Sequence, residues 1–133
     1  MNFENFKQKT LNVIKNSSSD LRRLKEDTDM YGFKNENGNY ILELDSFGDY
    51  GYVDILYPSF LEVADNSFDK EIFMFNRKYK AVAVWKDSND LWLSAHTIIL
   101  REDDYNLEYH EEMMNLIMNV ATDIHQRIMK LNT

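Results

Sequence analysis

The chain has 133 residues, with 15 Lys and Arg side chains against 23 Asp and Glu, and its net charge of -8 repels a phosphate backbone. The two basic clusters, Arg22/Arg23/Lys25 and Arg77/Lys78/Lys80, are too small to reverse that field, so we expect no nucleic-acid partner. The chain lacks cysteine, any long apolar run and an apolar leader in residues 1–11, so we expect a single cytoplasmic domain, residues 1–133, with no membrane partner.

The N-terminal third begins with apolar side chains at three- and four-residue steps, which predict a helix over about residues 2–28. Asn2 is placed to cap its first turn. Three consecutive serines, Ser17 to Ser19, weaken the middle of this segment, so a break into two shorter helices is the alternative.

Three short strands are predicted next. Residues 30–35 and 39–45 flank Asn37-Gly38, a pair typical of a type I′ hairpin turn. Residues 52–57 form the third strand, and Pro58, the only proline, is expected to end it.

The second half of the chain contains two further helices and one hairpin. Helical spacing predicts a short helix within residues 65–79, although residues 72–75 are also compatible with a buried strand. Residues 80–86 and 91–99 form a hairpin around the turn-forming residues 87–90, and a long apolar stripe predicts a helix over about 105–131 with Ile117 and Ile124 in the core. The expected fold is α+β, with a five-stranded, mainly antiparallel sheet and the order α-β-β-β-α-β-β-α.

This order of elements resembles the class I type III secretion chaperones and the YbjN-like domains that share their fold. The closest stretch runs from Phe68 to Leu100, where a helix leads directly into Lys80-Ala81-Val82-Ala83-Val84-Trp85 and a second strand. The resemblance implies a noncatalytic, often dimeric, protein-binding role, and it transfers no specific functional residues.

One face of the predicted sheet is a candidate interface. Period-two alternation assigns Tyr40, Leu42, Leu44, Val53, Ile55, Ala81, Ala83, Leu91 and Leu93 to the core face. The opposite face then carries seven apolar side chains, which we predict to be partner-binding: Ile41, Tyr52, Leu56, Val82, Val84, Trp92 and Ile98. We expect this face to bind another protein or a second copy of the chain, with Trp92 and Val84 as anchors; coverage by a terminal helix is the alternative.

No residue pattern predicts a catalytic, cofactor or metal site. His110-Glu111-Glu112-Met113-Met114 begins like a zinc-protease helix but has methionine in place of the second histidine, and the four glycines form no phosphate loop. Two pairs keep an enzyme or small-ligand domain open as the alternative: the carboxylates Glu43 and Asp54, and Ser94 with His96. We therefore predict a protein-binding module, and an acidic immunity or inhibitor protein is an alternative within the same class.

Overall fold

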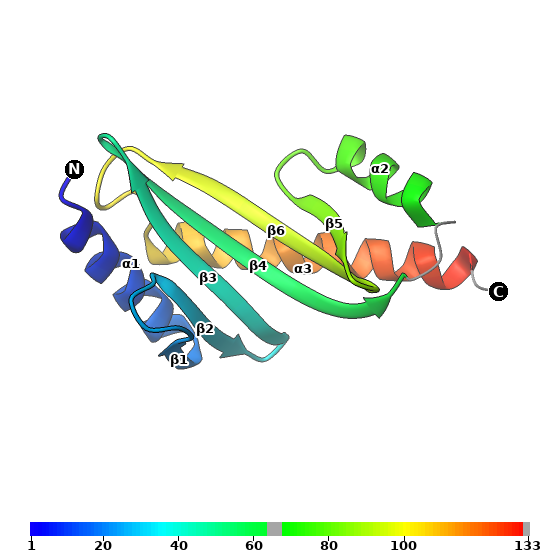
Figure 1. Ribbon diagram of the computed structural model, residues 1–133, viewed down its shortest axis with the longest axis horizontal. Helices are drawn as coiled ribbons and strands as arrows, with labels where there is room; N and C mark the ends of the chain where they lie inside the picture. Colours follow the sequence, from blue (N-terminus) through cyan, green and yellow to red (C-terminus); the bar gives the residue numbers. More distant parts are fainter. Residues whose placement is uncertain (64–67, 132–133) are drawn as a thin grey trace.

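The computed structural model describes residues 1–63 and 68–131, apart from the side chain of Phe60. Its elements are α1 (Phe3–Ser17), β1 (Ser19–Arg23), β2 (Met30–Asn35), β3 (Gly38–Phe47), β4 (Tyr50–Glu62), α2 (Asp69–Lys78), β5 (Ala83–Asp87), β6 (Asp90–Ile99) and α3 (Leu107–Leu131) (Figure 1). The described strands form one antiparallel sheet in the order β1-β2-β3-β4-β6-β5. The α+β class is confirmed, whereas the prediction of five strands is wrong because β1 adds a sixth.

The extra strand comes from the segment predicted to be the second half of the first helix. Asn2 does cap α1, accepting a hydrogen bond from the Asn5 amide at 3.0 Å. The helix ends at Ser17 because the hydroxyls of Ser17 and Ser18 donate to main-chain carbonyls of its last turn, and Ser18 adopts an extended conformation. The chain then pairs with β2 through an irregular register, in which Arg22 lies opposite Gly32.

Two turn predictions also need correction. The β2–β3 hairpin is confirmed, but its loop is Glu36-Asn37, and neither of these residues has the positive φ of a type I′ turn. The Asn35 side chain instead accepts from the Asn37 amide at 2.8 Å. Pro58 does not end β4, which continues to Glu62: Pro58 still pairs with Trp92 of β6, and the register becomes irregular only between Pro58 and Glu62.

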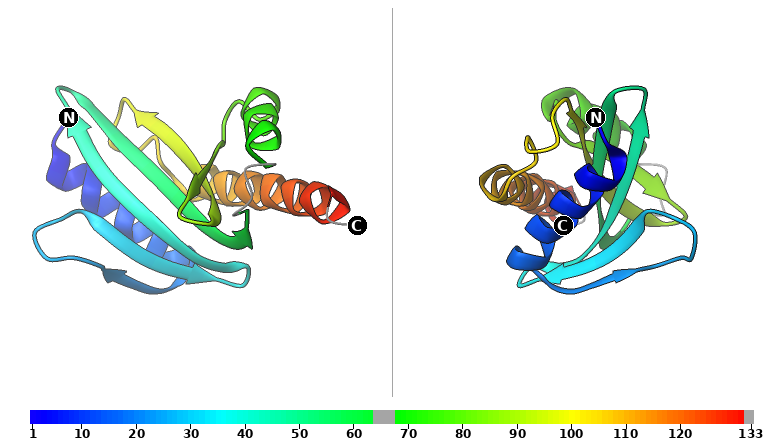
Figure 2. Two further views of the ribbon diagram at one scale, coloured as in Figure 1. Left: turned by 45° about the vertical axis from the view of Figure 1, so that its right-hand side comes forward. Right: turned by 90° about the vertical axis from the view of Figure 1, so that its left-hand side faces the viewer.

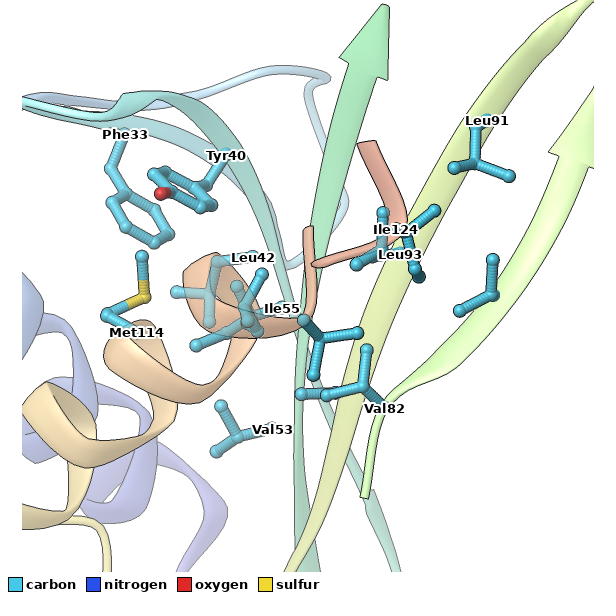
Figure 3. Close-up of a cluster of buried hydrophobic side chains, with 14 of the residues drawn as sticks. Phe33, Tyr40, Leu42, Val53, Ile55, Val82, Leu91, Leu93, Met114 and Ile124 are labelled. Atoms are coloured by element: carbon cyan, nitrogen blue, oxygen red, sulfur yellow. The ribbon is translucent and has the colours of Figure 1, made fainter. Parts of the chain in front are cut away.

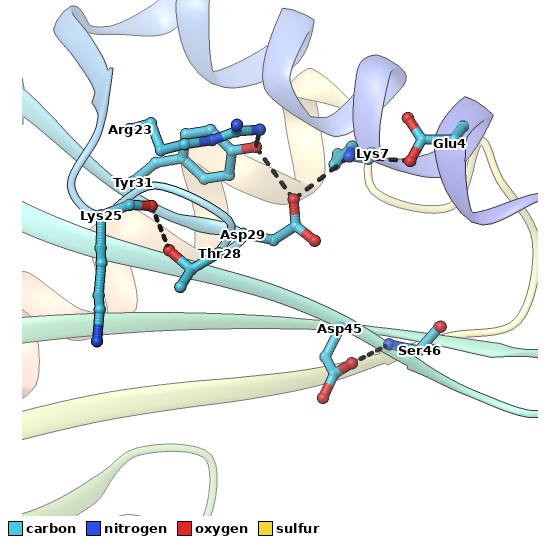
Figure 4. Close-up of polar contacts among 9 residues, drawn as sticks. All are labelled: Glu4, Lys7, Arg23, Lys25, Thr28, Asp29, Tyr31, Asp45 and Ser46. Atoms are coloured by element: carbon cyan, nitrogen blue, oxygen red, sulfur yellow. Dashed lines mark hydrogen bonds and ion pairs between the residues drawn. The ribbon is translucent and has the colours of Figure 1, made fainter.

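The helices α1 and α3 pack against the same face of the sheet (Figure 2). The core between them includes Ile117 and Ile124, which are fully buried, as predicted. Lys7 connects α1 to the loop before β2 through Asp29, at 3.3 Å, and the Tyr31 hydroxyl donates to the same carboxylate (Figure 4). These contacts fix the N-terminal helix on the core face.

The short helix α2 lies beside the edge of the sheet, next to β5 and the second half of α3. Phe75 is buried in the core, and Lys78 forms an ion pair with Asp123 of α3 at 3.2 Å. The Asn76 carboxamide accepts from the Val84 amide at 2.7 Å and donates to the Val84 carbonyl at 2.6 Å. One side chain thus satisfies the outer main-chain groups of an edge strand, which would otherwise be open to another chain.

Candidate protein-binding face

The sheet face opposite α1 and α3 is covered by none of the described helices. We call it the open face and define it by the outward side chains of β3, β4 and β6, together with Trp85 of β5 and Leu100, which directly follows β6. Cross-strand pairs place these side chains in rows, including Asp45 with Tyr52 and Ile98, and Glu43 with Asp54 and His96. The rows change in character along the strands, so the open face has an apolar end, an acidic middle and a tryptophan end.

The apolar end lies where the β3–β4 hairpin meets the end of β6. Phe47 pairs with Tyr50, and Tyr52 pairs with Ile98 one row further along. The exposed fractions are 75% for Phe47, 48% for Tyr50, 57% for Ile98 and 61% for Leu100. We call Phe47, Tyr50, Tyr52, Ile98 and Leu100 the apolar tip. Scattered exposed hydrophobic residues are ordinary, but a contiguous group of large ones on one sheet face is typical of an association surface.

The acidic middle contains Glu43, Asp45 and Asp54. Glu43 and Asp54 face each other across β3 and β4, as the sequence predicted. Partial burial, followed by the charges of Asp54 and Asp45, raises the pKa of Glu43 above its ordinary value. The His96 Nδ1 atom contacts the Asp54 carboxylate, and the His96 ring stacks on Tyr52 with centroids 5.4 Å apart.

The tryptophan end is built from a cross-strand pair on the β5–β6 hairpin. Trp85 and Trp92 lie opposite each other, and their rings stack with centroids 5.3 Å apart. Trp85 Nε1 donates to the Ser94 hydroxyl at 3.4 Å. Ile41 and Leu56, a half-buried cross-strand pair, lie between the Glu43–Asp54 row and this end of the open face.

Five of the seven predicted partner-binding residues lie on the open face: Ile41, Tyr52, Leu56, Trp92 and Ile98. The other two, Val82 and Val84, lie in the core, with exposed fractions of 1% and 2%. Figure 3 shows Val82 among the core side chains, and Ala81 and Ala83 are the exposed residues of this segment. The predicted alternation was therefore one residue out of phase in β5, because the larger valines fill core volume that alanine would leave empty.

Three residues of the apolar tip were missed in the sequence. Phe47, Tyr50 and Leu100 lie just beyond the predicted strand ends at residues 45, 52 and 99. The signal was present, because Phe47 continues the alternation of Glu43 and Asp45, and Leu100 continues that of His96 and Ile98.

The residue pairs considered for catalysis lie in neighbouring rows of the open face, where His96 contacts Asp54. Ser94 and His96 both line a depression of about 380 Å³ beside β6, between Tyr79 and Tyr109, whereas Glu43 and Asp54 lie outside its lining. No hydrogen bond joins Ser94 to His96 in the described part of the chain; the serine accepts from Trp85 and the histidine contacts Asp54. Within residues 1–63 and 68–131, no three His, Asp or Glu side chains are grouped to hold a metal ion.

His110, part of the failed zinc motif, is a core residue. Its Nδ1 atom lies 2.7 Å from the Tyr105 hydroxyl, and both side chains are buried. Burial lowers the pKa of His110 to about 4 and raises that of Tyr105, so both are neutral at pH 7. The pair satisfies two buried polar groups without exposing either to the open face.

The amino-acid sequence matches no protein-family model and no curated protein. None of the described helices is long and apolar enough to cross a membrane. The function of the chain therefore has to be inferred from the geometry of the open face.

Proposed function

We propose that this chain is a noncatalytic protein-binding domain and that the open face is its binding surface. The observation that carries the proposal is the asymmetry of the sheet. One face is buried under α1 and α3, while the other carries the apolar tip with no helix of the described chain above it.

The composition of the open face supports protein binding over binding of a small ligand. Small-ligand sites are usually concave and enclose most of the ligand, whereas protein interfaces are broad and combine aromatic anchors with a polar surround. The open face has the second character, with aromatic side chains at both ends and charged residues between them. An adaptor role like that of the secretion chaperones and YbjN-like domains, whose element order the chain resembles, fits this surface.

Site-specific photocrosslinking tests the proposal directly. A photoreactive phenylalanine analogue replaces Phe47 on the apolar tip or, as the control, Phe73 on α2, which is also exposed, at 61%. In the native cells, irradiation should yield a defined protein adduct from position 47 and none of the same mass from position 73. Adducts that are the same from both positions, or none from position 47, would contradict the proposed surface.

A further inference from the structure

The three central strands of the open face carry no cation, and Arg22 of β1, which lines a hollow with Ile41 and Pro58 at the β2 side of this face, forms an ion pair with Asp20. The outward residues of β3, β4 and β6 include Glu43, Asp45 and Asp54 but no lysine or arginine. Elsewhere in the described chain, carboxylates are commonly paired with lysine, as in Lys7–Asp29, Lys9–Asp103 and Lys78–Asp123. Among the three open-face carboxylates Glu43, Asp45 and Asp54, only Asp54 has a described side-chain partner, the His96 ring.

Covering such a face has an electrostatic cost that depends on the partner. The Glu43–Asp54 row lies one row from Tyr52 and Ile98, roughly 7 Å along the strands at about 3.4 Å per residue. A partner seated on the apolar tip therefore also desolvates these carboxylates. Desolvating a carboxylate without a cation beside it is unfavourable, so a stable partner has to bring positive charge.

A second copy of this chain is disfavoured as the occupant for the same electrostatic reason. A two-fold interface brings the same surface from each copy, so six carboxylates would converge without lysine or arginine from the three central strands. Each copy also carries a net charge of -8, which adds long-range repulsion.

We propose that the open face binds a basic segment of another protein, which places apolar side chains on the apolar tip and lysine or arginine against Glu43, Asp45 and Asp54. This inference rests on the proposed function and specifies the chemistry of the partner. Complementary charge gives such an interface its orientation and a salt-dependent association rate, while the tip provides the apolar anchors.

Selection from a random peptide library tests the partner chemistry. Phage displaying random 12-residue peptides are selected against the full chain, and the most enriched peptides are synthesised and titrated by fluorescence anisotropy. We expect enrichment of Lys or Arg together with aromatic or branched aliphatic residues. Binding to the wild type should weaken at least tenfold between 50 and 500 mM NaCl, on the order expected when several charge pairs form.

Matched variants separate a specific acidic surface from general attraction to an acidic protein. The triple variant Glu43→Gln/Asp45→Asn/Asp54→Asn raises the net charge from -8 to -5, because three negative charges are removed. The control Glu36→Gln/Glu111→Gln/Glu112→Gln reaches the same net charge through three exposed residues away from the open face. Circular dichroism and melting confirm that both are folded. The first variant should lose at least tenfold in affinity and the control less than twofold.

The remaining outcomes distinguish this inference from the proposed function. Selected peptides that lack Lys and Arg but lose affinity in an Ile98→Asp variant would overturn the basic partner and leave the binding face standing. Peptides unaffected by Ile98→Asp would overturn the face itself. Equal losses in both triple variants, the absence of any enriched peptide, or sedimentation showing a dimer that Ile98→Asp dissociates would each overturn the inference.

Discussion

Two adjacent isoleucines in β6 provide a direct test of which sheet face is core. Ile99 points into the core and is 1% exposed, whereas Ile98 points to the open face and is 57% exposed. Replacing Ile99 with Ala removes buried methyl and methylene groups and leaves a cavity, which costs about 2–5 kcal/mol. The same change at Ile98 removes atoms that are mostly in water and should cost less than about 1 kcal/mol.

These free energies convert to measurable shifts in melting temperature. At roughly 2.1 cal/mol/K per residue, the unfolding entropy of a chain of this length is about 280 cal/mol/K, so 3 kcal/mol lowers the melting temperature by about 11 °C. Ile98→Ala should therefore shift it by less than about 4 °C. Urea titration and thermal melting, both followed by circular dichroism at low protein concentration, measure the two variants. Equal destabilisation would show that the open face is covered, and a cost below about 1 kcal/mol at Ile99 would refute the core assignment.

Three further predictions follow from the packing. Trp92→Glu should remain folded, whereas Val84→Asp should unfold the domain because it buries an unpaired charge; unfolding of both in circular dichroism would mean that Trp92 is also core. Asn76→Asp loses the hydrogen bond to the Val84 carbonyl but keeps an oxygen that accepts from the Val84 amide. Asn76→Ala loses both hydrogen bonds to Val84. Hydrogen exchange at the Val84 amide should therefore accelerate much more in Asn76→Ala, and equal exchange in the two variants would contradict the edge-capping role. The pKa of His110 falls from 6.5 to about 4 on folding, so between these values the unfolded state binds a proton that the folded state does not. The stability present above pH 6.5 therefore falls by about 3 kcal/mol as pH drops towards 4. In urea titrations, His110→Phe should lose less stability than the wild type between pH 7 and pH 4.5, and parallel losses would refute the burial of His110.

The sequence predicted α3 and the β3–β4 pairing well because their patterns depend on many residues. The helix α3 has an apolar stripe through Ile117 and Ile124, and the Glu43–Asp54 pairing follows from alternation in two strands joined by a tight turn. Where the predicted secondary structure depended on only a few residues, tertiary contacts determined the observed structure instead. The spacing of Leu21 and Leu24 continues a helical stripe, yet pairing with β2 makes residues 19–23 a strand.

The site was predicted in part for the same reason. Alternation placed Ile98 and Trp92 correctly, but residues 81–84 are apolar at every position and therefore do not fix the phase of β5. Only the volume available in the core selects Val82 and Val84 for burial. The open face has no described helix above it because α1 and α3 pack on the other face of the sheet. Alternation along single strands cannot predict on which face a helix packs.

The central claim, that the apolar tip binds another protein, is tested most directly by one comparison of dissociation constants. The partner identified by crosslinking from position 47 is titrated against Ile98→Asp and against Phe73→Asp, which each place a charge at an exposed apolar position and are checked for folding by circular dichroism. Ile98→Asp should weaken binding at least tenfold, equivalent to about 1.4 kcal/mol or more, while Phe73→Asp should change it less than twofold. Equal dissociation constants for the two variants would contradict the central claim.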